Sequence, residues 1–231
     1  MVLTLAAATA LVATDPPLER SAERGAMVTE QIAARGVTDE RVLAAMREVP
    51  RHAFVPASWR HAAYADGPLP IGEGQTISQP FIVAIMTQLA DLQPGDRVFE
   101  IGTGSGYQAA VASRLAGHVW TMELIPSLGE RARKTLEELG FRNVTIRAGD
   151  GYGGWPEHAP FDAIFVTAAA SHIPPPLIEQ LKAGGRMIVP VGPAFSTQRL
   201  MLVEKDATGR VTTRALFPVS FVPLVRGGKG P

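Results

Sequence analysis

In the stretch VFEIGTGSGYQ, residues 98–108, an apolar run is followed by an acid and then by a glycine at every second position. A strand that ends in glycines and opens into a helix is typical of a loop whose backbone approaches a nucleotide cofactor. The dinucleotide fingerprint G-x-G-x-x-G is broken, because Tyr107 stands where its third glycine belongs. The spacing therefore favours a nucleotide cofactor that presents no pyrophosphate to the loop. A tight turn without a ligand is the alternative, and it would need fewer glycines.

Strand and helix patterns alternate around this loop. Short apolar runs predict strands over residues 97–101, 118–123, 144–147, 161–167 and 186–191. Helical spacing predicts helices over residues 27–35, 40–48, 81–92, 107–116, 126–139 and 175–181, the second of them capped by Asp39. Residues 200–224 are expected to form antiparallel strands that turn at residues 206–209, and residues 50–80 a long loop. The chain is therefore predicted to be an α/β protein with a Rossmann-like, doubly wound, mostly parallel sheet of about seven strands, helices on both faces and an N-terminal helical extension.

Three acidic residues lie on or after the first three predicted strands. Glu100 lies two residues before the first glycine, Glu123 ends the second strand, and Asp150 follows the third. Parallel neighbouring strands bring their carboxyl ends to one crevice, where Glu123 could accept from both ribose hydroxyls and Asp150 from an adenine amine. Each acid alone could be a helix cap or a solvated loop residue, but together they describe an adenosine pocket. An adenosine cofactor without a pyrophosphate loop suggests S-adenosyl-L-methionine.

Several motifs resemble those of the class I methyltransferases, which use this cofactor. E-x-G-x-G-x-G resembles their first motif, FDAIFVTAA (residues 161–169) their fourth-strand motif, and LKAGGRMIVPVG (residues 181–192) the segment around their fifth strand. Methyltransferases that act on amide or exocyclic nitrogens resemble one another in an Asn/Asp-Pro-Pro-aromatic sequence on the fourth strand, which residues 167–171 lack. A carboxylate nucleophile fits better. It is already ionised at neutral pH because its pKa is about 4, so it needs positioning and no general base.

The loop before the sheet carries the most specific resemblance. GQTISQPFIVA (residues 74–84) and YADGPLPIG (residues 64–72) resemble the N-terminal part of the protein-L-isoaspartate O-methyltransferase family. VFEIGTGSGYQ, GDGYGGWPEHAPFDAIFVTAA (residues 149–169) and FVPLV (residues 221–225) match that family in the same order, so the resemblance runs from about Thr29 to Val225. It implies methyl transfer from S-adenosyl-L-methionine to the α-carboxylate of L-isoaspartyl residues in damaged proteins, with S-adenosyl-L-homocysteine as product. The ester would then cyclise to a succinimide, and its hydrolysis returns some normal aspartate.

By the same resemblance, Ser78 is the expected catalytic residue, whose hydroxyl would donate to the acceptor carboxylate and hold it for in-line attack. The residues alone would favour Ser78 as the cap of the helix near Pro80, and both roles can hold through different atoms. The expected cofactor-binding residues are Glu100, Gly102, Thr103, Gly104, Gly106, Glu123, Asp150, Gly151 and Thr167. The expected substrate-binding residues are Thr76, Ile77, Ser78, Gln79, Val222, Pro223 and Leu224. The last three could bind an extended peptide through their backbone, or they could form an ordinary closing strand.

Residues 1–26 lie outside the resemblance. Residues 2–13 form an apolar run of the length of a signal-peptide core, but no Lys or Arg precedes it. A disordered tail or a true start at Met27 are the alternatives, so a cytoplasmic location is expected, with export as the other possibility. Residues 27–231 are predicted to form one methyltransferase domain. Within it, residues 27–92 carry the N-terminal helices and substrate loop, residues 93–195 the cofactor-binding core, and residues 196–231 the C-terminal strands.

The amino-acid composition limits the kinds of partner and cofactor that are expected for this chain. The 231 residues carry 22 basic and 22 acidic side chains and so lack the basic excess of nucleic-acid-binding proteins. Without cysteine, disulfides and cysteine-ligated metals are excluded, and the five histidines show no metal-ligand spacing, so no metal is expected. The expected partners are damaged proteins and peptides with L-isoaspartyl residues, without nucleic acid or stable membrane association, and the enzyme is expected to be a monomer.

Other classes of function fit the sequence less well. An NAD(P) dehydrogenase needs the dinucleotide loop that Tyr107 breaks, and a serine hydrolase with Ser105 as nucleophile needs a glycine in place of Thr103. The TISQP sequence argues against a binding module without catalytic activity. A methyltransferase for another small carboxylic acid is the strongest alternative.

Overall fold

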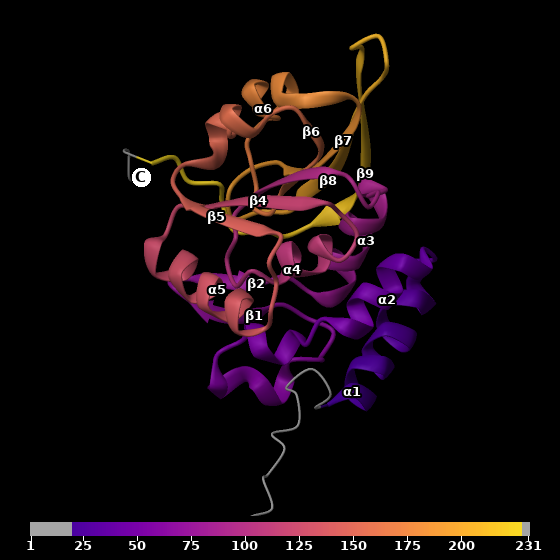
Figure 1. The fold of residues 1–231 in the computed structure, drawn as a ribbon, viewed down its shortest axis with the longest axis vertical. Coiled ribbons are helices and arrows are strands. Elements are labelled where there is room, and N and C mark those ends of the chain that lie inside the picture. Colours follow the sequence, from indigo (N-terminus) through magenta and orange to yellow (C-terminus); the bar gives the residue numbers. More distant parts are fainter. Residues whose placement is uncertain (1–19, 228–231) are drawn as a thin grey trace, which may run out of the picture.

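A seven-stranded sheet runs through the centre of the computed structural model, which describes residues 20–227 (Figure 1). Its strands are β3 (Arg97–Ile101), β4 (His118–Glu123), β5 (Val144–Ala148), β6 (Phe161–Val166), β7 (Leu181–Val191), β8 (Gln198–Lys205) and β9 (Val211–Val219). They lie in the order β5-β4-β3-β6-β7-β8-β9. The first five strands in this order pair in parallel, and β8 and β9 are added antiparallel at one edge.

Helices flank the sheet and begin where the sequence provides start signals. They are α1 (Ser21–Ala26), α2 (Glu40–Glu48), α3 (Pro80–Ala90), α4 (Tyr107–Ser113), α5 (Pro126–Glu138) and α6 (Pro175–Gln180). A π-helical stretch (Met27–Ile32) and a short 3-10 helix (Ala33–Arg35) join α1 to α2, and further 3-10 turns lie at Arg51–Phe54, Ala57–Ala62, Gly151–Gly153 and Pro156–His158. The Asp39 carboxylate accepts from Arg41 N at 2.8 Å, which confirms the predicted cap of α2. Proline occupies the first turn of α3, α5 and α6, where its missing N–H is not needed.

The two faces of the sheet bury different sets of helices. Side chains alternate along each strand, so Val98 of β3 joins a cluster with α2, α3, α4 and α5, whereas Phe99 joins a cluster with Leu177 of α6. Figure 1 shows α6 above the sheet and α3, α4 and α5 below it, with α1 and α2 further down. The sheet is therefore a buried middle layer, as a parallel sheet requires.

The chain order creates a crevice at one edge of the sheet. After β3 the chain passes to β4 and β5 on one side, and β6 then lies on the other side of β3. In sheets of this kind, ligands bind outside the carboxyl ends of the two strands at which the order reverses. Here those ends are Ile101 of β3 and Val166 of β6.

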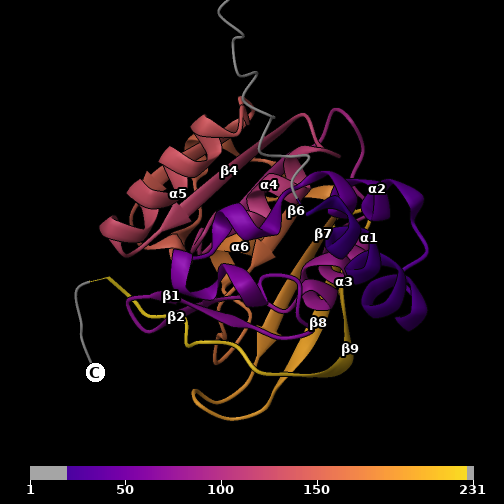
Figure 2. The same cartoon turned by 90° about the horizontal axis from the view of Figure 1, so that it is seen from below.

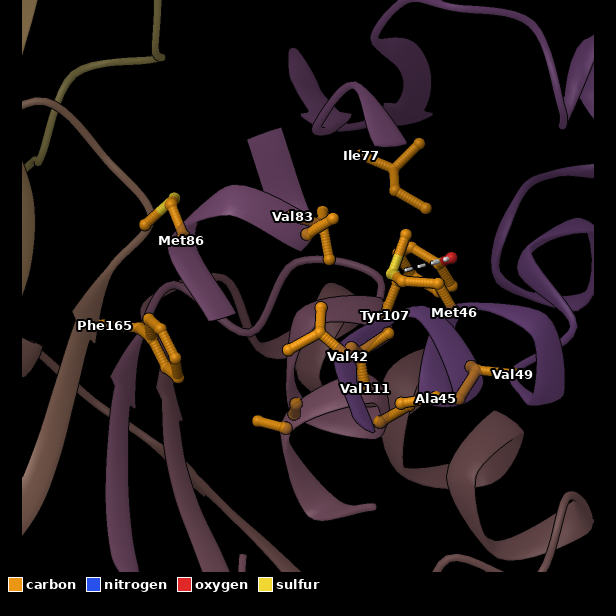
Figure 3. Close-up of a cluster of buried hydrophobic side chains, with 14 of the residues drawn as sticks. Val42, Ala45, Met46, Val49, Ile77, Val83, Met86, Tyr107, Val111 and Phe165 are labelled. Atoms are coloured by element: carbon orange, nitrogen blue, oxygen red, sulfur yellow. Dashed lines mark hydrogen bonds between the residues drawn. The ribbon is translucent and has the colours of Figure 1, made fainter. Parts of the chain in front are cut away.

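The N-terminal helices pack over the helix that follows the glycine loop. Figure 3 shows Met46 of α2 near Tyr107 of α4, and the Tyr107 hydroxyl approaches the Met46 sulfur at 3.9 Å. Phe54 also meets the Tyr107 ring edge-on, with ring centroids 5.5 Å apart. The first residue of α4 is therefore held by the N-terminal segment as well as by the sheet.

The predicted fold is confirmed, but several elements differ in detail. β7 begins at Leu181, five positions before the predicted start. Residues 50–80, predicted as a loop, contain a hairpin of β1 (Leu69–Gly72) and β2 (Gln75–Ile77), whose turn residues Gly72, Glu73 and Gly74 all have positive φ. Such short strands carry too few alternations to be visible as a pattern. The export signal considered for residues 1–13 lies outside the described residues, and within residues 20–227 no helix is long and apolar enough to cross a membrane.

Candidate active site

A cavity, here called the main cavity, lies at the carboxyl ends of β3 and β6. Four segments line it: residues 75–78 of the hairpin, residues 100–105 of the glycine loop, residues 122–125 at the end of β4, and residues 222–225 near the C-terminus. Its other lining residues are Val83, Tyr107, Gln108, Gly149, Gly151, Thr167 and Ala168. Figure 2 shows the hairpin and the yellow C-terminal segment on the same side of the sheet. The cavity therefore occupies the crevice that the strand order creates.

A second depression, here called the side groove, opens from the same place. It is lined by Pro68, Thr76, Ser78, Gln79, Ile82, Thr167, Thr197 and residues 218–222. Thr76, Ser78, Thr167 and Val222 border both the main cavity and the side groove. A molecule in the groove can therefore approach one in the cavity.

The glycine loop is shaped by a close contact with Thr167. The Thr167 hydroxyl lies 2.8 Å from Ile101 O and 2.7 Å from Gly102 O, so it ties the end of β6 to the end of β3. Gly102 has φ +92, and a Cβ there would lie 2.5 Å from the Thr167 hydroxyl oxygen. Only glycine fits this position, which explains the first glycine of the motif.

Glu123 holds the loop from the neighbouring strand. Its carboxylate accepts from Gly104 N at 2.7 Å and from Ile125 N at 2.9 Å, one bond to each oxygen. The side chain is buried and borders the main cavity. Each carboxylate oxygen has two lone pairs, so each retains one for a further donor. The structure thus leaves room for the predicted ribose contact.

Glu100 is a buried carboxylate with one unpartnered oxygen. Thr121 donates its hydroxyl to Oε2 at 2.5 Å, and Thr103 in turn lies 2.7 Å from the Thr121 hydroxyl. Because Thr121 has only one hydroxyl proton, Thr103 is the donor in that second bond. Oε1 has no hydrogen-bond partner among residues 20–227, and Glu100 borders the main cavity. Burial, opposed by the Thr121 bond and reinforced by Glu123, raises the pKa of Glu100 to about 8.

Replacing Glu100 with glutamine should stabilise the free protein in a pH-dependent way. The carboxyl has a pKa near 4.5 in the unfolded chain and about 8 in the folded one, so the folded parent loses stability as pH rises between these values. Glutamine does not titrate. The melting temperature of E100Q should therefore exceed that of the parent by a margin that grows through this window, at about 2–4 °C for each kcal/mol recovered. Thermal melts at about pH 5, 6.5 and 8 measure the margin, with Glu130→Gln on the exposed side of α5 as control. A margin that does not change with pH would contradict the assigned titration.

Ser78 lies between the main cavity and the side groove. The cap of α3 is Gln79, not Ser78, and no side chain makes a capping bond there, so the interpretation of Ser78 as a helix cap is wrong. The structure gives the Ser78 hydroxyl no hydrogen bond with any residue from 20 to 227. The hydroxyl is therefore free to donate to a molecule that reaches this wall.

The C-terminal segment closes the other side of the cavity. Ala169 N donates to Val222 O at 2.8 Å and Leu224 N to Ala169 O at 2.8 Å, so residues 222–224 form a short parallel bridge beyond β6. Val222, Pro223 and Leu224 all line the main cavity, as do Thr76 and Ile77 on the hairpin side. All of the predicted substrate residues except Gln79 therefore meet at one cavity.

Three predicted site residues lie outside the main cavity. Gln79 borders only the side groove and donates to Asp66 at 2.7 Å. Gly106 borders neither. Asp150 does not line the main cavity either; its carboxylate accepts from Tyr152 N at 2.9 Å, from Gly227 N at 3.0 Å and from Arg226 Nε at 3.2 Å. In this structure Asp150 anchors the C-terminal segment, and its predicted adenine contact stays a prediction.

Some lining residues were not predicted from the sequence. In the main cavity they include Gln108, Met122, Leu124 and Ile125, and in the side groove Thr197 and residues 218–221. Leu124 and Ile125 directly follow Glu123, so their place at a strand end could have indicated them. Nothing in the sequence indicates Thr197 or residues 218–221, because they reach the groove only through the pairing of β8 and β9. Within residues 20–227 there is no group of three acidic or histidine side chains that could hold a metal ion.

The comparisons with known proteins agree on one family. The family model described as protein-L-isoaspartate(D-aspartate) O-methyltransferase matches residues 22–229. Protein-L-isoaspartate O-methyltransferase 2 of Polaromonas sp. is 65% identical over 80% of this chain and 88% of the relative, and the protein-L-isoaspartate O-methyltransferase of Opitutus terrae is 58% identical over 90% of this chain and 88% of the relative.

Two solved structures of the same description resemble this one. The first, a protein-L-isoaspartate O-methyltransferase, has a TM-score of 0.77 and 34% identity, over 87% of this chain and 65% of that chain. The second, from Plasmodium falciparum and in complex with S-adenosyl-L-homocysteine, has a TM-score of 0.76 and 27% identity, over 88% of this chain and 99% of that chain.

Proposed function

This chain belongs to the protein-L-isoaspartate(D-aspartate) O-methyltransferase family of S-adenosylmethionine-dependent enzymes, and we propose that it methylates L-isoaspartyl residues where its main cavity meets its side groove. The acceptor is the α-carboxylate of an L-isoaspartyl residue in a damaged protein, and the ester begins its repair. The observation that carries the assignment of sites is the position of Ser78, whose uncommitted hydroxyl borders both spaces.

The main cavity offers the hydrogen-bond acceptors that S-adenosyl-L-methionine needs. The cofactor carries an ammonium and a sulfonium, and the side chains of Glu100 and Glu123 border the cavity. An ammonium donor would satisfy the buried, unpartnered Oε1 of Glu100. Glu123 would accept from the ribose hydroxyls with its remaining lone pairs. The other proposed cofactor contacts that line the cavity are Gly102, Thr103, Gly104, Gly151 and Thr167.

The proposed chemistry requires positioning and no proton transfer. When bound, S-adenosyl-L-methionine supplies an electrophilic methyl group on its sulfonium. Ser78 would donate its hydroxyl to one oxygen of the acceptor carboxylate and direct the other oxygen toward that methyl group. The carboxylate is ionised at neutral pH and needs no base. In keeping with this, His52 borders neither space and lies 2.7 Å from the Tyr64 hydroxyl, in a buried cluster.

The side groove is proposed to hold the polypeptide on either side of the isoaspartyl residue. None of its lining side chains is ionisable, so it can accept neutral and apolar stretches of many proteins. Gln79 and Val222 border it, and Thr76 is shared with the main cavity. A groove that requires no particular sequence beside the isoaspartyl residue suits an enzyme whose substrates share only that damaged residue.

We propose that the enzyme acts as a cytoplasmic monomer on proteins and peptides, without nucleic acid or stable membrane association. The balance of 22 basic and 22 acidic side chains supports the first of these exclusions. Residues 27–231 are proposed to be one domain, although α1 (Ser21–Ala26) precedes that boundary and runs directly into the helical stretch at Met27.

A methylation assay tests the proposal directly. The full chain is incubated with labelled S-adenosyl-L-methionine and either an isoaspartyl peptide or the same sequence with normal aspartate. We expect a base-labile methyl ester on the isoaspartyl peptide alone. Equal labelling of both peptides, or none, would reject the proposed substrate, and labelling of small carboxylic acids in preference to the peptide would favour the alternative methyltransferase.

A further inference from the structure

We propose that Phe195, on the loop between β7 and β8, contacts the substrate polypeptide beside the isoaspartyl residue and contributes to its affinity. This loop, residues 192–197, is called the β7–β8 loop below. The inference rests on the proposed function, because the polypeptide is taken to lie in the side groove. It assigns a specificity residue that lies outside the sequence motifs of the site.

Two features of Phe195, the exposure of its side chain and the conformation of its backbone, are unfavourable in the isolated protein. Its side chain is 92% exposed, compared with 48% for Val225 and 38% for Trp59, the other large apolar side chains exposed within residues 20–227. Its φ is +57°, in the left-handed region, where a residue with a Cβ is strained. A single exposed apolar side chain needs no explanation by itself. An exposed aromatic held in a strained backbone next to a functional groove points to a contact with another molecule.

The β7–β8 loop is fastened at both ends. Gly192 N donates to Ala170 O at 2.9 Å, just beyond β6. The buried Gln198 donates from Nε2 to Pro193 O at 3.1 Å and accepts at Oε1 from Phe221 N at 2.8 Å. One amide therefore closes the loop on itself and joins it to the segment that lines the side groove. Because these hydrogen bonds fix the backbone of the loop, less conformational entropy is lost when a partner binds Phe195.

Phe195 stands close to the end of the side groove. Thr197, two residues further along, lines the groove together with Phe221 and Val222. Consecutive Cα atoms are about 3.8 Å apart, so the Cα atoms of Phe195 and Thr197 lie within about 7.6 Å of each other. An extended peptide rises about 3.3 Å per residue, so a chain that passes Thr197 needs only two or three residues to reach Phe195.

A polypeptide is the occupant that fits this arrangement. The groove is continuous with the wall that carries Ser78 and has no ionisable side chain, and Pro68, Ile82 and Phe221 give it apolar surface, so apolar contact can contribute to its affinity for a polypeptide. An aromatic ring offers a large rigid surface at low entropic cost, and phenylalanine is among the residues enriched at interfaces. Because the ring has no polar atom, it favours apolar neighbours of the isoaspartyl residue without requiring one sequence.

Steady-state kinetics with two peptides test the inference. One is a blocked isoaspartyl tripeptide, too short to reach Phe195, and the other a peptide of about ten residues with leucine two and three positions from the isoaspartyl residue. For Phe195→Ala we expect the KM of the long peptide to rise about tenfold, the kcat to stay unchanged, and the tripeptide KM to stay unchanged. The dissociation constant of S-adenosyl-L-homocysteine should not change.

Matched variants separate the side chain from the backbone. Phe195→Gly also removes the ring but relieves the strain, so it should match Phe195→Ala in KM, whereas Phe195→Leu should keep part of the affinity. Trp59→Ala removes an exposed aromatic that borders neither space and should leave every constant unchanged. Equal KM values for parent and Phe195→Ala with the long peptide, or an equal rise with the tripeptide, would overturn the inference while leaving the methyltransferase intact. A parent enzyme that esterifies neither peptide would instead overturn the proposed function.

Discussion

Alanine in place of Ser78 is expected to lower kcat roughly 100-fold, while the dissociation constant of S-adenosyl-L-homocysteine changes less than about twofold. The hydroxyl borders the wall between the main cavity and the side groove and has no hydrogen-bond partner among the described residues. Its removal therefore breaks no internal bond and should not weaken the fold. What is lost is the donor that would fix the acceptor carboxylate, and a small misplacement of reacting atoms costs about two orders of magnitude in rate.

Three measurements decide this result. Turnover with an isoaspartyl peptide gives kcat, calorimetric titration gives the affinity for S-adenosyl-L-homocysteine, and a thermal melt confirms that the variant folds. Ser220→Ala is the matched control, because Ser220 borders the side groove without reaching the main cavity, and it should keep most of the parent's kcat. Ser78→Thr keeps a hydroxyl and should recover part of the rate. An equal loss of turnover and cofactor affinity in Ser78→Ala would mean that the hydroxyl serves the cofactor and not the acceptor.

The local parts of this site could be predicted because their physical signals are local. The glycine loop follows a strand directly, and β3 and β4 run over the predicted residues 97–101 and 118–123. Parallel neighbours then necessarily bring Glu100 and Glu123 to one crevice. Because β3 and β4 are adjacent both in sequence and in space, the positions of these two residues could be predicted from local patterns.

The parts that depend on distant segments could not be predicted in the same way. Asp150 follows a strand end like Glu123, yet its carboxylate binds Arg226 and Gly227, which come from the other end of the domain. Thr197 reaches the side groove because β8 pairs antiparallel with both β7 and β9, and no local pattern encodes that position. The fold at the level of the sheet was therefore accessible from periodicity, whereas the far walls of both spaces were decided by long-range pairing.

Alanine in place of Glu123 is expected to weaken binding of S-adenosyl-L-homocysteine by about 10- to 100-fold, since a hydrogen bond to a charged group contributes roughly 1.5–3 kcal/mol. The carboxylate is proposed to accept from the ribose while it holds Gly104 N and Ile125 N. Its loss therefore has two consequences. The cofactor loses its acceptor, and two N–H groups of the loop lose theirs, which should lower the melting temperature as well. Glutamine keeps one carbonyl oxygen and should show an intermediate loss of affinity. Glu130→Ala, on the exposed side of α5, is the control and should change neither quantity.

An altered ligand separates the two consequences of losing Glu123. An analogue of S-adenosyl-L-homocysteine that lacks both ribose hydroxyls cannot donate to the carboxylate, so the parent should bind it more weakly than the natural product. If Glu123 binds the ribose, Glu123→Ala should bind the analogue almost as well as the parent does, because the interaction is already absent. The coupling between the variant and the altered ligand, measured by titration of all four combinations, is the energy of that contact. If the variant instead loses the same affinity for both ligands, Glu123 acts only by shaping the loop through Gly104 and Ile125, and the ribose contact is excluded.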